Sequence, residues 1–482
     1  MRNVIWAGRT LILAGLAGAM AAAAATPTFN HDIAPILYSN CATCHRPGEV
    51  APFSLLTYQD AAKRAKQIAT VTQSRFMPPW KAEPGYGEFQ NERRLTDAQI
   101  AVLKDWAANG APEGDPSEKP TPPTFSEGWQ AGQPDKVFKL ANAYSLPADG
   151  PDQYRCFVIP MNLDQDVYVK SFEFRPDNRK IVHHAIVFSD PNGNARRLAR
   201  NGNSYPCFGG PGFAPISMVA GWAPGGSPSL AGPGMSLTVT KGSDLVLQIH
   251  YHPSGKAEQD QSSLGMTFGD PPTVGRGMVF INSRAIHIAA GDSHYVVKTG
   301  ITIPQDVEVL GITPHAHYLG KDMKIDAKLP DGSVQHMIWI KDWDFNWQGQ
   351  YRYKEPVKLP KGTRVELEYT YDNSAANIRN PSHPPVNVHW GEQTTDEMAL
   401  AFLSVKLKSM DDQALFQKQI GLEFINEFLA QADNLSDFPP EISPQARARL
   451  TMAIGLFDRN HDGKLDDQER KTLMDFLRAR LQ

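Results

Sequence analysis

The 482-residue chain has only four cysteines, too few for a network of disulfides to hold its fold together. It also has no excess of positive charge, because 48 Lys and Arg residues face 52 Asp and Glu residues, and this argues against nucleic-acid binding. Beyond residue 25 no run of about 18 uninterrupted apolar residues occurs, so we expect no membrane span. Hydrophobic residues make up 41% of the chain and charged residues 21%, which excludes a largely disordered protein.

Residues 1–25 have the pattern of a secretory signal peptide. Arg2 and Arg9 supply positive charge, an apolar stretch rich in alanine follows, and Ala23–Ala25 fits an A-x-A cleavage site. We therefore expect a bacterial protein that is exported to the periplasm or the medium, with the signal removed. Retention of this segment as a membrane anchor is the alternative.

Composition divides the remainder of the chain into five segments. Residues 27–116 have a mostly helical pattern, and the Pro-rich residues 117–135 predict a stiff, extended linker. Short alternating runs separated by turn residues predict strands from there on, and about 270 such residues fit two sandwich domains, at 136–267 and 268–409. Residues 410–482 return to helix. The sequence predicts a multidomain protein with a small all-α domain, two β-sandwich domains and a helical C-terminal segment.

A C-x-x-C-H motif, the attachment signature of c-type haem, lies in the first helical segment. Cys41 and Cys44 are three positions apart on a helical turn, so both thiols can bond one porphyrin, and His45 is placed under the iron. A redox dithiol and a zinc pair are the alternatives. The directly following histidine, the signal peptide and the absence of a second C-x-x-C motif favour one haem c. Residues 27–116 resemble small class I cytochrome c domains.

The second axial ligand of this haem is expected to be Met77. Two prolines follow Met77 and would hold an extended loop against the haem face. A thioether ligand raises the reduction potential and suits electron transfer. His31 is the competing ligand, and a role for Met77 in core packing is a further alternative.

Histidines are paired within the predicted strands. The pairs are His183 and His184, His250 and His252, and His315 and His317. Residues two apart in a strand share a face, so His315 and His317 can converge on one ion. Adjacent residues point to opposite faces, so His183 and His184 can share a metal only if the strand has a bend or bulge there. Imidazole clusters of this kind suit copper or zinc.

Four motifs occur in the order found in the copper type II, ascorbate-dependent monooxygenases, which include peptidylglycine α-hydroxylating monooxygenase and dopamine β-hydroxylase. The motifs are Val182–His184, Gln248–Tyr251, His315–Lys321 and Asp396–Met398. The chain is similar to this family over roughly residues 150–405.

The resemblance implies two jelly-roll-like β-sandwich domains that each hold one copper, with an open cleft between them. The implied ligands are His183, His184 and His250 for the copper that supplies electrons, and His315, His317 and Met398 for the copper that activates oxygen. A soft thioether favours Cu(I), the state that binds dioxygen, although Met398 could instead be a packing residue. His252 shares a strand face with His250 and could replace it as a ligand or contact it from outside, and we expect the outer position; His389 could contact a ligand as well.

Cys156 and Cys207 lie in the predicted β region and could form a disulfide after export. Because members of the family carry several disulfides there, these two cysteines could instead be remnants of two different pairs.

The resulting hypothesis is a copper monooxygenase that uses O2 to hydroxylate a C–H bond of a small molecule. Electrons would reach the coppers from an external donor through the chain's own haem. A haem and copper electron-transfer or copper-binding protein without catalysis is the main alternative. A haem enzyme such as a peroxidase is another, and ligation by Met77 would argue against it.

The substrate is expected to be neutral. In the peptide-amidating relatives, an Arg two positions before the H-x-H pair, together with an Asn and a Tyr after the ligand Met, grips a peptide carboxylate. The corresponding residues here are Thr313, Leu400 and Phe402, which form an apolar wall. The alternative is that Lys321 or Arg284 takes over the carboxylate.

Residues 458–469 match the D-x-N-x-D-G-x₅-E pattern of an EF-hand calcium loop. The expected calcium ligands are Asp458, Asn460, Asp462, the carbonyl of Lys464, Asp466 directly or through water, and a bidentate Glu469. An acidic, solvated loop is the alternative. A single EF-hand is expected to stabilise or dock rather than to sense calcium signals.

Overall fold

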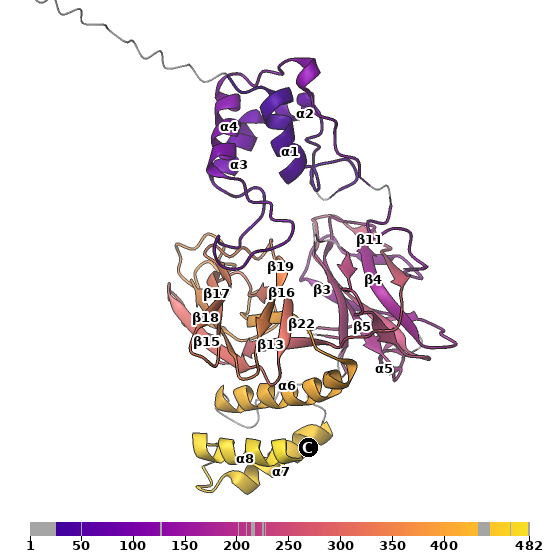
Figure 1. Ribbon diagram of the computed structural model, residues 1–482, viewed down its shortest axis with the longest axis vertical. Coiled ribbons are helices and arrows are strands. Elements are labelled where there is room, and N and C mark those ends of the chain that lie inside the picture. The colour runs from indigo at the N-terminus through magenta and orange to yellow at the C-terminus, as the bar shows by residue number, and fades with distance from the viewer. Residues whose placement is uncertain are drawn as a thin grey trace, which may run out of the picture.

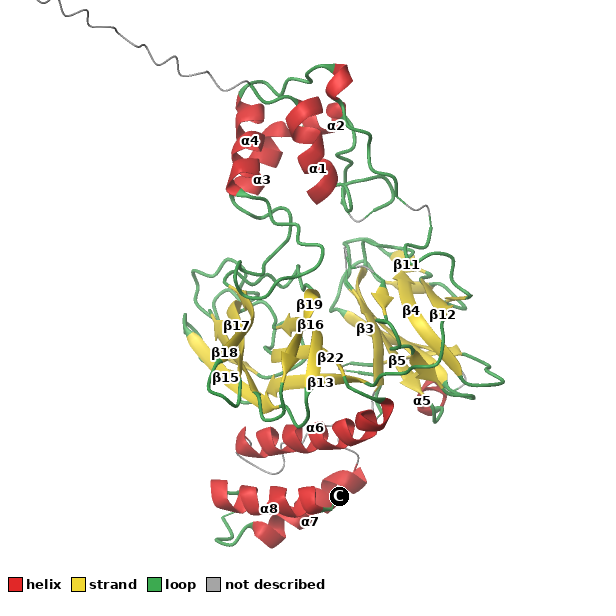
Figure 2. Ribbon diagram, in the orientation of Figure 1, coloured by secondary structure: helices red, strands yellow, loops and turns green. Residues whose placement is uncertain are grey.

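The computed structural model describes residues 26–480 except residues 50, 126–127, 201, 209, 214–216, 224–225, 227, 432–443 and 463. The expected signal peptide at residues 1–25 lies outside the described residues. A small helical unit lies at one end, two β units lie side by side, and the C-terminal helices lie at the opposite end (Figures 1 and 2).

The helical unit contains one π-helical turn, four α-helices and their own hydrophobic core. Its elements are η1 (Phe29–Ile33), α1 (Ala34–Asn40), α2 (Tyr58–Ala62), α3 (Ala65–Gln73) and α4 (Asp97–Ala108). Helix α4 begins at a capping box in which Thr96 and Gln99 bond each other's backbone N–H groups. It buries Leu103 and Trp106 against Phe29. The remaining residues of this unit are loops, so less of the segment is helical than its pattern predicts.

The first β unit consists of antiparallel sheets with the strand orders β1-β12-β4-β8 and β6-β3-β10-β5-β7, and strand β9 also pairs with β4. A separate pair joins β11 to β2. The strands are β1 (Lys136–Lys139), β2 (Tyr144–Leu146), β3 (Gln153–Pro160), β4 (Val167–Arg175), β5 (Val182–Asp190), β6 (Ser204–Pro206), β7 (Ser217–Trp222), β8 (Ser229–Leu230), β9 (Leu237–Val239), β10 (Asp244–Tyr251), β11 (Glu258–Asp260) and β12 (Ser263–Phe268).

Strand β10 is the central strand of its sheet, and all eight of its residues are buried. Leu245, Leu247 and Ile249 face the core of the first unit, whereas the alternate residue Val246 packs with Cys156 on the other face. Cys156 and Cys207 form a disulfide, so the first of the two alternatives for these cysteines is confirmed. The short helix α5 (Asn194–Ala199) contributes Ala195 and Ala199 to the same cluster.

The second β unit has two four-stranded antiparallel sheets, ordered β13-β22-β16-β19 and β15-β20-β17-β18, and a pair β14-β21. The strands are β13 (Arg276–Ser283), β14 (His287–Ile288), β15 (Tyr295–Thr302), β16 (Val307–His315), β17 (Gly320–Lys328), β18 (Val334–Ile340), β19 (Tyr351–Leu359), β20 (Arg364–Tyr371), β21 (Val388–His389) and β22 (Ala399–Lys406). Among the described residues, no sheet combines strands of both units. The prediction of a β-rich chain with several sheets and additional helical segments is confirmed.

The loop between α3 and α4 docks on the second β unit. Ala82 and Phe89 form β-bridges with Ile340 and Tyr353, so the loop adds backbone pairing to strands β18 and β19. The Lys81 ammonium lies 2.9 Å from a carboxylate oxygen of Asp342. The helical unit is therefore attached to the second β unit through backbone hydrogen bonds as well as side chains.

The Pro-rich linker begins with a short 3-10 helix, η2 (Pro116–Glu118), and its far end packs on the first β unit. The backbone N–H groups of Gln130 and Ala131 donate to the carboxylate of Glu173 at 2.9 and 2.8 Å. The guanidinium of Arg175 lies over the ring of Trp129. This end of the linker is packed, unlike the extended spacer that its composition predicts.

Three helices complete the chain: α6 (Met410–Gln431), α7 (Pro444–Phe457) and α8 (Asp467–Ala479). Helix α6 packs on β13 and β15, where Phe416 is fully buried and Glu427 forms a two-bond ion pair with Arg364 at 2.8 and 3.0 Å. Among the described residues, no helix combines the length and the apolar character that a membrane crossing requires.

Candidate metal centres

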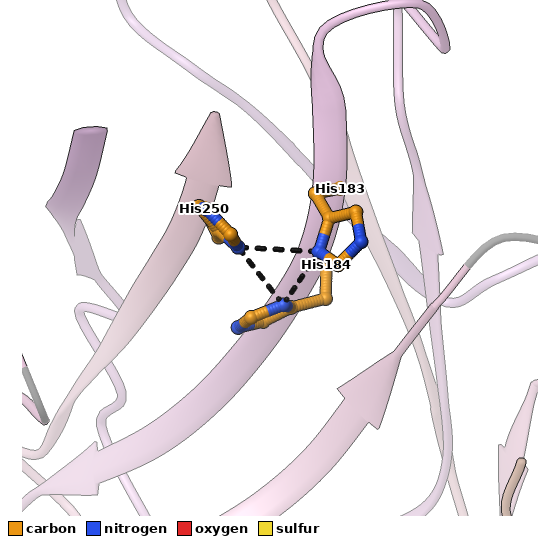
Figure 3. A group of neighbouring side chains, drawn as sticks. All are labelled: His183, His184 and His250. Atoms are coloured by element: carbon orange, nitrogen blue, oxygen red, sulfur yellow. Dashed lines mark hydrogen bonds between the residues drawn. The ribbon is translucent and has the colours of Figure 1, made fainter. Parts of the chain in front are cut away.

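His183, His184 and His250, here called the first histidine cluster, converge from two neighbouring strands (Figure 3). Strand β10 pairs with β5 so that His250 lies opposite His184, but the next residue, Tyr251, lies opposite Val182. His183 is therefore the extra residue of a β-bulge. The bulge turns His183 to the side of its neighbour, as a shared metal site requires.

The three Nδ1 atoms of the first histidine cluster form a nearly equilateral triangle. Their separations are 3.3 Å between His183 and His184, 3.2 Å between His183 and His250, and 3.3 Å between His184 and His250. The centre of a triangle with these sides lies about 1.9 Å from each corner. Metal–imidazole bonds are about 2.0–2.1 Å long, so the three nitrogens already surround a point at which one ion fits.

Asp152 holds the first histidine cluster in place from outside. One of its carboxylate oxygens lies 2.7 Å from Nε2 of His250, and the other lies 2.7 Å from Nδ1 of His252. A hydrogen on Nε2 of His250 leaves Nδ1 with a free lone pair directed at the cluster. The ring of Tyr154 stacks on His250 at 4.2 Å. His252 is thus placed beside a ligand and not in the triangle.

Burial keeps the imidazoles of His183 and His184 neutral. Burial, followed by the neighbouring His250, lowers the pKa of His183 to about 3. The same two causes lower the pKa of His184 well below its usual value. A neutral imidazole has a lone pair that can bind a metal, so these lowered pKa values favour metal binding by His183 and His184 at neutral pH.

His315 and His317 are here called the second histidine pair. His315 is the last residue of β16, and His317 lies two residues further along the chain. Their Nδ1 atoms are occupied: that of His315 lies 2.6 Å from the side-chain oxygen of Gln348, and that of His317 lies 3.0 Å from the carbonyl oxygen of Asp396. These partners leave both Nε2 atoms for a metal. Burial lowers the pKa of His315 to about 3 and that of His317 to about 4, so both imidazoles are neutral.

The residues on both sides of Met398 contact the second histidine pair. His315 pairs with Leu400, two residues after Met398, and Asp396, two residues before it, bonds His317 through its carbonyl. The hydroxyl of Tyr371 donates to the Met398 carbonyl at 2.6 Å. The buried Glu397 carboxylate accepts the N–H groups of His317 and Leu319 at 2.9 and 2.6 Å. Burial nevertheless raises the pKa of Glu397 to about 8.

The two histidine sites lie close together across the boundary between the β units. The ring of Phe345 stacks on His183 at 5.5 Å and meets His317 edge-on at 5.7 Å. The rings of His183 and His317 are therefore no more than about 11 Å apart. Phe345 therefore lies between the first histidine cluster and the second histidine pair.

The C-x-x-C-H residues form a turn after α1. The N–H of His45 donates to the Cys41 carbonyl at 2.9 Å, and His45 Nδ1 lies 3.2 Å from the Phe53 carbonyl, which leaves Nε2 for an iron. Cys41 and Cys44 are free thiols, and burial raises the pKa of Cys41 to about 12. A cavity beside Cys44 is lined by Arg179 and Trp222 of the first β unit.

Two buried donors in the docked loop support a fit for haem. The Nε atom of Arg93 and the Nε1 atom of Trp80 have no hydrogen-bond partner within the described part of the chain. The charge of Arg93 acts on both Cys44 and Tyr351, and Trp80 meets Tyr351 edge-on at 5.3 Å. Haem carries two carboxylates, which take hydrogen bonds from guanidinium and indole donors. Met77 lies in the same loop, whereas His31 is exposed on η1 and bonded to Asp32.

The C-terminal motif forms a helix-loop-helix between α7 and α8. Asp466 caps α8 and bonds the N–H groups of Gln468 and Glu469. The Glu469 carboxylate accepts from the N–H of Arg459 at 2.7 Å and from that of Asp466 at 3.0 Å, which closes the loop. Asp462 bonds both Asn460 and Lys464. These oxygens belong to the loop positions at which an EF-hand binds calcium.

Sequence reasoning missed the residues that orient the ligands. Asp152, Gln348 and Phe345 lie in loops or next to strand ends, and no motif connects them with the histidines. Asp152 is 98 residues from His250, and Gln348 is 33 residues from His315. A search for carboxylates and amides would not have singled out Asp152 or Gln348, since the chain holds many such side chains.

Comparisons with known proteins add little. No family model matches the chain, and no curated protein matches it. A structure of PNGF-II has 11% sequence identity and a TM-score of 0.22, with 60% of this chain and 64% of that chain covered, so the match spans less than two thirds of PNGF-II. The infectious bursal disease virus VP2 subviral particle has 11% identity and a TM-score of 0.16, over 60% and 76%. Likenesses this weak carry no argument about function.

Proposed function

We propose that the protein is an exported copper-dependent monooxygenase that uses O2 to hydroxylate a C–H bond of a small neutral molecule. In this proposal the first histidine cluster holds one copper, the second histidine pair with Met398 holds another, and the C-x-x-C-H segment is a cytochrome c domain. The two β units correspond to the two copper domains of the ascorbate-dependent family that the sequence resembles.

The observation that carries the proposal is the pair of unlike histidine sites around Phe345. One site offers three Nδ1 atoms at metal-binding spacing, and the other offers two histidines whose Nδ1 atoms are already bonded, with Met398 as the expected sulfur ligand. Imidazoles suit copper in both oxidation states, and a soft thioether favours Cu(I). The two sites would therefore differ in chemistry although they lie close together.

The chemistry of hydroxylation calls for such a division. Insertion of one oxygen atom of O2 into a C–H bond, with the other atom leaving as water, consumes two protons and two electrons from outside the substrate. One copper supplies a single electron, so a second copper is needed as a reservoir. Burial keeps the imidazoles of His183, His315 and His317 neutral. Asp152, Gln348 and the Asp396 carbonyl hold His250, His315 and His317 in one tautomer.

The remaining groups support this function. Haem attached at Cys41 and Cys44, with His45 and Met77 as expected ligands, would supply electrons from an external donor. The disulfide between Cys156 and Cys207 is compatible with an oxidising compartment. One calcium ion at residues 458–469 would stabilise the C-terminal helices. Thr313, Leu400 and Phe402 share one face of the sheet with His315, and this apolar face supports a neutral substrate.

Oxygen uptake tests the proposal. The full chain, loaded with copper and haem and supplied with an artificial electron donor, is screened with small neutral compounds in an oxygen electrode. We expect uptake that needs both copper and substrate, with one hydroxylated product for each O2 consumed. A protein that binds copper but consumes no oxygen with any compound would be an electron carrier, which is the alternative.

A further inference from the structure

One fully buried carboxylate, that of Glu397, lies beside the second histidine pair and is not an expected metal ligand. Glu397 is 0% exposed, and burial of a carboxylate is costly unless other groups compensate it. The partners of this carboxylate are backbone N–H groups rather than cationic side chains. An apolar side chain could fill the same space without that cost, so the carboxylate indicates a specific requirement at this place in the fold.

Three N–H groups converge on the two oxygens of the Glu397 carboxylate. Oε2 accepts from the N–H of His317 at 2.9 Å and from that of Met398 at 3.2 Å. Oε1 accepts from the N–H of Leu319 at 2.6 Å. Because one oxygen serves both His317 and Met398, their backbone nitrogens are no more than about 6.1 Å apart. Glu397 thus joins two expected copper ligands from distant parts of the chain.

The backbone of Glu397 is fixed independently of its carboxylate. Its N–H donates to the His389 carbonyl at 3.1 Å, and its carbonyl accepts from the N–H of Gly391 at 3.2 Å. The indole N–H of Trp343 donates to the His317 carbonyl at 3.0 Å. The carboxylate therefore extends from an anchored backbone to the turn between β16 and β17, which carries His317.

The three donors match a carboxylate and not its amide. A glutamine has one acceptor oxygen, and its NH2 group would face either the N–H of Leu319 or those of His317 and Met398. An aspartate keeps both acceptors but is shorter by one C–C bond, about 1.5 Å. Substitutions at Glu397 can therefore remove an acceptor or move both acceptors with little change in volume.

We propose that Glu397 is a positioning residue that preorganises the second copper site by holding His317 and Met398 at a fixed separation. This inference rests on the proposed function, because it assumes that these two residues bind copper. Without the carboxylate, the metal itself would have to bring the two ligands together and order the turn. Loss of comparable groups that orient metal ligands weakens metal binding about 10- to 100-fold.

The test uses the full, haem-loaded chain in a His183→Ala and His250→Ala background, so that copper binding at the second site is measured alone. An anaerobic Cu(I) titration gives the affinity, and X-ray absorption at the copper edge shows whether sulfur is bound. We expect Glu397→Gln to lower the Cu(I) affinity at least tenfold and to remove the sulfur neighbour. A role in packing alone would leave the sulfur neighbour in place.

The matched control is Glu173→Gln in the first β unit. The Glu173 carboxylate is also buried and also accepts two backbone N–H groups, those of Gln130 and Ala131. This substitution therefore removes the same kind of contact away from the second site, and it should change neither the Cu(I) affinity nor the sulfur neighbour.

The outcomes separate this inference from the proposed function. Equal Cu(I) affinity and an equal sulfur contribution in Glu397→Gln and Glu173→Gln would overturn the positioning role alone. Absence of copper-bound sulfur with Glu397 intact would overturn both the ligand assignment and the positioning role. If Glu397→Gln does not fold, Glu397→Asp decides, and we expect it to weaken Cu(I) binding as well. An unchanged affinity in Glu397→Asp, or failure of both variants to fold, would overturn the inference.

Discussion

Replacement of Asp152 by Asn should weaken copper binding at the first histidine cluster although Asp152 is not a ligand. The Asp152 carboxylate accepts hydrogen bonds from both His250 and His252 at 2.7 Å. Burial raises the pKa of Asp152, but the hydrogen bonds from these two histidines outweigh burial and lower it below its usual value. An amide has only one acceptor oxygen, so Asn can serve one histidine and presents an N–H group to the other.

The magnitude follows from the role of such partners. Loss of a group that orients a histidine ligand costs about 10- to 100-fold in metal affinity. That range corresponds to about 1.4–2.7 kcal/mol. We expect the upper part of the range, because His250 is only 1% exposed and water cannot readily replace the lost bond. The variant His252→Ala keeps the hydrogen bond that His250 donates to Asp152, so it should change the copper affinity less than threefold.

The assay is an anaerobic Cu(I) titration against a coloured chelator. It is performed in a His315→Ala and His317→Ala background, so that a single copper site remains to be measured. The matched control is the exposed Asp149→Asn, which removes the same charge three residues away. Equal copper affinity in Asp152→Asn and Asp149→Asn, with both variants folded, would refute the assigned role of Asp152.

Three further predictions concern the other sites. The double variant His315→Ala and His317→Ala should lose one copper per chain and all hydroxylation with an unchanged haem spectrum; metal analysis that still finds two coppers would contradict the ligand assignment. Glu469→Gln should weaken calcium binding at least tenfold by calorimetry without loss of copper, because it removes a bidentate carboxylate; Asp467→Asn, whose side chain is 94% exposed outside the ligand positions, is the control. Arg93→Gln should lower the midpoint potential of the haem, because a nearby positive charge favours the reduced form. Arg94→Gln, whose guanidinium is already bonded to the Ala82 carbonyl and to Glu92, should not alter it; equal potentials in the two variants would contradict the assignment of Arg93.

Local patterns predicted the strands that carry the candidate ligands. Strand β10 has an almost continuous apolar sequence because it is buried on both faces. In β16 buried residues alternate with more exposed ones because one face of the strand packs in the core. The need for a bulge at His183 followed from the geometry of a strand alone, and the register of β5 on β10 confirms it. The pairing of Cys156 with Cys207 could not be predicted from the sequence, because their separation along the chain does not reveal the distance between them in the fold.

Long-range contacts could not be predicted in the same way. The segment between α3 and α4 is a loop because its backbone pairs with β18 and β19, and nothing in its own pattern reveals those partners. Phe345 contacts histidines of both β units, and its role depends on how the units pack. The identity of the metals and the haem remains a prediction from motifs; the spacing of the three Nδ1 atoms shows only that the first histidine cluster could hold one ion.

X-ray absorption at the copper edge would test the central claim most directly. The fully loaded Cu(I) protein should hold two coppers per chain and show an average of one sulfur neighbour for every two coppers, because only the second site includes Met398. The sulfur contribution should disappear in Met398→Ile while the imidazole contribution remains. A spectrum of the unaltered protein without sulfur, or one whose sulfur persists in Met398→Ile, would contradict the claim that the second histidine pair and Met398 form a copper site.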